Sequence, residues 1–151
     1  MGWYSEVSRD ISKIADAIDY YEKELLVARK ELQLTGNIEK AAASLPGLIE
    51  YRFNQLQEIE AILNYLNLEI RRMKSRFFKK YLEHYQRALS SRDAEKYIEG
   101  EADVVDYEHI INEFALLRNK WLGIIKAFDQ KSFSLNNVVR LRSAGLEDAT
   151  L

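Results

Sequence analysis

The feature that most constrains this chain is a spacing of three and four residues between apolar side chains, repeated in three segments. These segments cover residues 4–32, 56–77 and 107–128. The spacing averages 3.5 residues and places each series along one face of a helix, whereas a strand would alternate every second residue. The sequence therefore predicts an all-α protein of long amphipathic helices. We expect them to pack as antiparallel hairpins in a coiled-coil-like bundle.

Glycine, proline and serine residues predict where these helices begin and end. Gly36 is expected to end the first helix in the left-handed conformation, and Ser44 with Pro46 to begin the second long helix. Ser90 is expected to cap a new segment that Gly100 interrupts. The expected stretches are a short helix over 38–43, long helices over about 44–89 and 103–130, and a last short helix from 134 to 145.

The third apolar series lacks a partner in a simple helical hairpin, which covers two such series. A monomeric helical hairpin is the alternative, but large exposed apolar patches usually mark interfaces. The sequence therefore predicts a homo-oligomer. Its expected interface is formed by Ile110, Phe114, Leu117, Trp121, Ile124 and Phe128.

No catalytic, metal-binding or cofactor-binding pattern stands out. The chain has no cysteine, and its two histidines, His84 and His109, fall on different predicted helices outside any two-histidine metal motif. The acidic residues between 95 and 108 are read as a solvated helix surface in preference to a divalent metal site. We expect no enzyme activity, no metal and no cofactor.

No apolar run reaches the roughly 18 residues of a membrane span, and the first residues do not resemble a signal peptide. We therefore expect a cytoplasmic protein that has no contact with a membrane.

Charge is strongly segregated along the chain. Residues 70–87 contain seven bases and one acid, residues 93–113 eight acids and one lysine, and residues 118–142 six bases and one acid. We call the first of these segments the basic block and the second the acidic block. Blocks of opposite sign indicate that the chain meets a charged partner or pairs with itself.

The basic block predicts contact with a nucleic acid, single-stranded DNA above all, or with another polyanion; the alternative is that these cations form a solvated helix face. Clustered cations follow a phosphate backbone, and aromatic rings can stack unpaired bases. The expected contacts are Arg71, Arg72, Lys74, Arg76, Lys79 and Lys80. Phe77 and Tyr81 continue the apolar series, so we favour a core role for both over base stacking.

The basic block resembles the UvsY family of phage recombination mediators. Its residues 73–77, Met-Lys-Ser-Arg-Phe, with Tyr81 and Tyr85 following, are similar to that family's basic-hydrophobic helix. A tryptophan-centred helix around Trp121 and the residues 140–145, Arg-Leu-Arg-Ser-Ala-Gly, are similar to the family's C-terminal portion. The likeness covers roughly residues 45–145.

This resemblance implies a phage protein of the host cytoplasm that binds single-stranded DNA as a ring-like homo-oligomer. It implies that the chain loads a RecA-like recombinase onto DNA covered by single-strand-binding protein. Lys74 and Arg76 would contact DNA, and the C-terminal helices would assemble the ring. The corresponding regions are an N-terminal helical arm over 1–45, a DNA-binding region over 46–100 and an oligomerisation region over 101–151.

A structural coiled-coil adaptor is the main alternative. In that case the basic block would bind an acidic protein or the acidic block of a neighbouring copy. An enzyme is the third and least favoured interpretation.

Overall fold

The computed structural model describes residues 2–84 and 89–145, and every regular element in these ranges is helical. The prediction of an all-α fold is therefore confirmed. The elements are α1 (Trp3–Arg9), the 3-10 turn η1 (Ile11–Lys13), α2 (Ile14–Glu31), α3 (Ile38–His84), α4 (Ser91–Glu99) and α5 (Ala102–Ser143).

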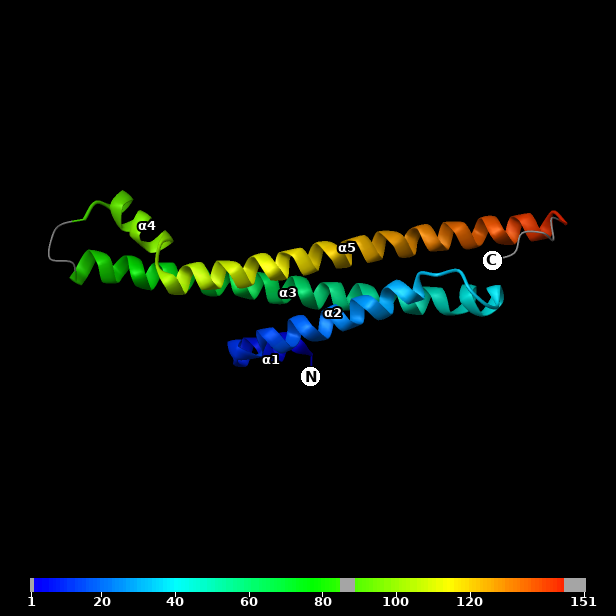
Figure 1. Ribbon diagram of the computed structural model, residues 1–151, viewed down its shortest axis with the longest axis horizontal. Coiled ribbons are helices and arrows are strands. Elements are labelled where there is room, and N and C mark those ends of the chain that lie inside the picture. The colour runs from blue at the N-terminus through cyan, green and yellow to red at the C-terminus, as the bar shows by residue number, and fades with distance from the viewer. Residues whose placement is uncertain (1, 85–88, 146–151) are drawn as a thin grey trace.

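Two very long helices define the shape of the molecule. Figure 1 shows α5 returning alongside α3 in the opposite direction, so that the pair forms the long axis of the fold. α1 lies beside the middle of α3, and α2 runs from there toward the start of α3 and also contacts α5. α4 folds back beside the last turns of α3.

The spacing predicted one continuous helix for the first apolar series, but the structure divides this series into separate elements. Asp10 has an extended backbone, with φ −146° and ψ 104°, and separates α1 from the short turn before α2. Its carboxylate accepts hydrogen bonds from the Ser12 amide at 3.0 Å and the Ser12 hydroxyl at 2.7 Å. This local pairing replaces helical bonds, which is a familiar competition at aspartate and serine.

The second long helix begins earlier than expected. Asn37 caps α3, because its side-chain oxygen accepts hydrogen bonds from the amides of Glu39 at 2.8 Å and Lys40 at 3.2 Å. Pro46 therefore lies inside α3 on its exposed side, and Ser44 donates to a carbonyl of the preceding turn at 3.3 Å instead of capping a helix. The predicted boundary between 43 and 44 is wrong.

The other predicted boundaries have mixed outcomes. Gly145 follows α5 with a positive φ angle of 80°, as the helix-end prediction required. The same prediction is wrong for Gly36: α2 ends at Glu31 with Leu32 as its right-handed cap, and Gly36, with φ 77°, lies further along in the loop. The side chain of Ser90 accepts the Asp93 amide hydrogen at 3.2 Å, and Gly100 caps the end of α4, so both breaks are confirmed. The predicted extension of α3 to residue 89 falls partly on residues 85–88, outside the described residues.

The predicted break before residue 134 is absent, because α5 is one helix from Ala102 to Ser143. Its apolar face continues through that point: Phe128 and Leu135, seven residues apart, are both buried. A serine in the helix interior is tolerated when packing holds the turns on both sides.

All three apolar series meet in one core within the chain. Trp121, Phe114 and Phe128 of α5 are fully buried and pack in the same cluster as Tyr21 of α2 and Ile59 of α3. Of the six residues expected at an oligomer interface, only Ile110 keeps part of its surface, and it too packs against this cluster. A single chain therefore covers the third apolar series, contrary to the prediction, because α2 packs against α5 together with α3.

Candidate nucleic-acid interface

Five exposed cations of α3 share the solvent side of its last turns. At 100° per residue, four of them lie within about 100° of one another around the helix, and Arg71 lies beside them. Arg72 makes an ion pair with Glu69 at 2.9 Å, and Glu83 is an exposed acid on the same stretch. We call this set the cationic face; it consists of Arg71, Arg72, Arg76, Lys79 and Lys80. Arg87, a further base of the block, lies outside the described residues.

The opposite side of these turns packs on α4 and the start of α5. Ile70, Ile98 and Val104 form a small buried core there, and four partly buried side chains of α3 surround it: Met73, Phe77, Phe78 and Tyr81. The ring of Tyr81 stacks on Tyr97 with centroids 5.9 Å apart, and its hydroxyl donates to Glu101. This placement agrees with the core role favoured for Phe77 and Tyr81.

Lys74 lies between these two sides and differs from the other cations of the block. Its ammonium group is paired with Glu99 at 3.1 Å and Glu108 at 3.3 Å, and its side chain is 33% exposed. The hydrogen bond to Glu99 raises the pKa of Lys74, because it stabilises the charged form. The acidic block therefore pairs with the basic block inside one chain, and it does so at the lysine expected at the centre of the DNA site.

One shallow cleft lies where the cationic face meets the small core. It has a volume of about 250 Å³ and is lined by Met73, Arg76, Phe77, Lys80 and Asp103. The Lys80 ammonium lies 5.9 Å from the centre of the Phe77 ring.

The bases of α5 do not form a comparable cluster. Lys120, Lys126, Arg140 and Arg142 are exposed but are spread over more than five turns of the helix. Lys131 instead donates a hydrogen bond to the backbone carbonyl of Glu31 at the end of α2.

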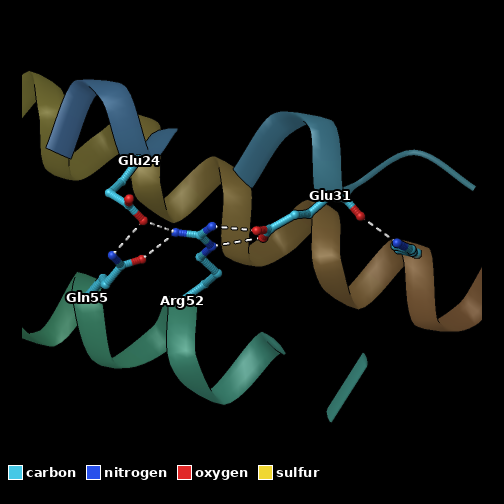
Figure 2. A network of polar contacts seen from close by, with 5 residues as sticks. Glu24, Glu31, Arg52 and Gln55 are labelled. Atoms are coloured by element: carbon cyan, nitrogen blue, oxygen red, sulfur yellow. Dashed lines mark hydrogen bonds and ion pairs between the residues drawn. The ribbon is translucent and has the colours of Figure 1, made fainter. Parts of the chain in front are cut away.

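Sequence reasoning missed a buried polar network in the main core (Figure 2). The side chain of Arg52, 2% exposed, binds both carboxylate oxygens of Glu31, at 2.6 and 2.9 Å, and one oxygen of Glu24 at 2.6 Å. Gln55 accepts from Arg52 at 2.8 Å and donates to Glu24 at 3.1 Å. The sequence did contain a signal for this network: Arg52 lies four residues before Leu56, the first residue of the second apolar series, and so falls on the same face of the helix.

Burial and hydrogen bonding shift the pKa values of this network in opposite directions. Burial lowers the pKa of Arg52, but the hydrogen bonds to Glu31 and Glu24 outweigh it and the net shift is upward. Burial raises the pKa of Glu24, but its hydrogen bonds from Gln55 and Arg52 outweigh that effect and the net shift is downward. The network therefore keeps both charges and joins α2 to α3.

Within residues 2–84 and 89–145, no group of three or more acidic or histidine side chains is arranged to hold a metal ion. In those same ranges no helix combines the length and the apolar character that crossing a membrane requires.

The chain was compared with models of protein families, with curated proteins and with solved structures. None of the three comparisons found a match.

Proposed function

We propose that the cationic face of α3 binds single-stranded DNA and that the chain acts as a non-enzymatic recombination mediator. The observation that carries the proposal is the grouping of five exposed cations on one side of α3, while the acidic block is folded against the other side. A strand approaching that side would meet mainly positive charge. Electrostatic contacts of this kind supply most of the affinity in sequence-independent binding.

The shape of this surface favours a single strand over a specific duplex site. The cationic face lies on a helix that is packed along its other side, and the cleft beside Phe77 offers one aromatic surface at its edge. Single-strand binders commonly combine a cationic track with aromatic contacts to bases. The two arginines and two lysines that lie closest together would supply the track: Arg72, Arg76, Lys79 and Lys80.

The mediator role rests on the resemblance of residues 45–145 to the UvsY family. In that proposal the chain loads a RecA-like recombinase onto DNA covered by single-strand-binding protein, and several copies act together as a ring. The ring would need contacts outside the buried face of α5, because that face is filled by α2 and α3.

The test is a titration of fluorescent single-stranded DNA at several salt concentrations. The triple variant Arg76→Ala, Lys79→Ala, Lys80→Ala should weaken binding and flatten its dependence on salt. Its matched control, Lys120→Ala, Lys126→Ala, Arg140→Ala, removes the same charge from exposed positions of α5. Equal losses in the two variants would show that net charge alone, and not the cationic face, controls binding.

A scaffold that assembles with itself is the second candidate, and exposed apolar side chains of α5 favour it. Phe133 is 65% exposed, and Leu116, Val139 and Leu141 are also exposed. A second copy of the chain is the partner that this candidate requires. Under it, Phe133→Ser with Leu141→Ser would reduce the mass measured by light scattering, and the cationic-face variant would leave that mass unchanged.

A further inference from the structure

A shallow pocket of about 450 Å³ lies at the end of the molecule opposite the cationic face, where the loop between α2 and α3 passes α5 (Figure 1). Lys40, which lines it, and Arg71 of the cationic face are about 45 Å apart along α3, so the two surfaces are separate. The lining residues are Lys30, Lys40 and Lys131; Thr35 and Ser44; Gln33 and Asn37; Ala41 and Leu48; and Glu31.

The three lysines of the lining come from three different helices. Lys30 belongs to the last turn of α2, Lys40 to the first turn of α3 and Lys131 to α5. Lys131 is half-buried, and its ammonium group donates a hydrogen bond to the backbone carbonyl of Glu31, which holds it beside the pocket. This bond joins residues 100 positions apart, so the fold, and not the local sequence, brings the three cations together.

Carboxylates do not neutralise these cations. Both carboxylate oxygens of Glu31, the acid of the lining, are bound by the buried Arg52 at 2.6 and 2.9 Å (Figure 2). Within residues 2–84 and 89–145, no carboxylate forms an ion pair with Lys30, Lys40 or Lys131. A concave surface lined by one sign of charge concentrates the opposite ion, so the pocket attracts an anion.

The neutral side chains of the lining suit a phosphate group. The hydroxyls of Thr35 and Ser44 and the amide of Gln33 can donate hydrogen bonds to phosphate oxygens. The Ser44 hydroxyl donates to the Ala41 carbonyl at 3.3 Å, a long bond that it can exchange for a charged acceptor. The side-chain oxygen of Asn37 is already bound to the first amides of α3.

We propose that this pocket binds a pyrophosphate group. A phosphate monoester carries about −1.5 to −2 near neutral pH, so two linked phosphates match the three ammonium groups in charge. The phosphates of a DNA strand carry one charge each and are spread along the backbone, so they match the pocket less well. This inference is independent of the proposed function, because none of the lining residues belongs to the cationic face.

The test titrates sodium pyrophosphate into the full chain at constant ionic strength and follows the backbone amide signals by NMR. Saturable shifts are expected at Thr35 and Asn37, which line the pocket. Inorganic phosphate should bind more weakly than pyrophosphate, and acetate should give no saturable shift. The Arg76, Lys79, Lys80 triple alanine variant should keep the wild-type pyrophosphate affinity at Thr35, which separates this pocket from the cationic face.

Two variants assign the binding to these lysines. Lys40→Gln and Lys131→Met should each weaken pyrophosphate binding about tenfold, as expected for the loss of one hydrogen bond between charged groups. The matched control Lys126→Gln removes an exposed charge of α5 outside the pocket and should leave the affinity unchanged. Circular dichroism checks that each variant is folded. Lys40→Gln alone decides the outcome if Lys131→Met unfolds the chain, because Lys40 is exposed.

The absence of a saturable shift at Thr35 in millimolar pyrophosphate would overturn the proposal. An affinity that Lys40→Gln leaves at the wild-type value would overturn it as well. Displacement of pyrophosphate by single-stranded DNA at an equal phosphate concentration would also contradict it, since the pocket would then be a second DNA contact.

Discussion

The ammonium nitrogen of Lys74 lies 3.1 Å from a carboxylate oxygen of Glu99, across the contact between α3 and α4. A second carboxylate, from Glu108 of α5, lies 3.3 Å from the same nitrogen. Lys74 thus joins three helices at the end of the molecule where charge is most segregated. Its pairing separates the basic block into one bound lysine and a cationic face that remains open to solvent.

Lys74→Ala should loosen α4 while changing the affinity for single-stranded DNA by less than about threefold. The pairs are partly exposed, so their loss should cost at most about 1 kcal/mol. Hydrogen exchange should become faster at the amides of α4 and stay unchanged in the central part of α3. Lys23→Ala is the control, because it breaks an exposed pair within α2, outside the cationic face. A large loss of DNA binding in Lys74→Ala would instead place this lysine in the interface, as the family resemblance implied.

Arg52→Met should lower the free energy of unfolding by about 3 kcal/mol, since it leaves two carboxylates facing a buried site without their partner. Chemical denaturation followed by circular dichroism measures this. Lys23→Met is the control, because Lys23 is exposed and pairs with its helical neighbour Asp19. Losses of similar size in the two variants would contradict a special role for the network in Figure 2.

The same network predicts how stability depends on pH. The pKa of Glu24 is lowered in the folded chain from its usual value of 4.5, so between the two values the unfolded state binds more protons. The stability contributed by Glu24 is therefore present above about pH 4.5 and is lost as the pH falls through the folded pKa. Denaturant titrations between pH 7 and pH 3 should show that the free energy of unfolding falls less with decreasing pH in Arg52→Met than in the wild type. An identical pH dependence would contradict the pairing.

Trp121→Glu should unfold the chain. Trp121 is fully buried between α2 and α3, so a carboxylate there would lose its hydration. Arg52, whose centre lies 5.9 Å from the indole ring, is already paired with Glu24 and Glu31. Circular dichroism should show lost helicity at 25 °C. A variant that stays helical but falls to a smaller mass in light scattering would restore the interface role first expected for this residue.

The apolar spacing was enough to predict the helical class and the stripe around Trp121, because periodicity reports directly which face is buried. It could not tell which surface would cover that stripe. The answer depends on α2 lying against α5, a contact between segments about one hundred residues apart in sequence.

Helix ends were predictable where one residue decides the geometry, as at Gly145, and not where two candidates compete. Asn37 and Ser44 both suit a helix cap, and Asn37 takes the role through two amides. For the candidate site, the charge blocks were visible in the sequence. The pairing of Lys74 with Glu99 was not, because it depends on α4 folding back on α3.

Binding of single-stranded DNA by the cationic face is decided by measuring affinity against salt for the wild type and for the Arg76, Lys79, Lys80 triple alanine variant. Each phosphate neutralised contributes about −0.7 to the slope of log affinity against log salt. We expect the variant to bind all sequences more weakly, with a slope about 2 smaller in magnitude than that of the wild type, at unchanged helicity. Wild-type binding that is negligible, or a slope that the three substitutions leave unchanged, would contradict it.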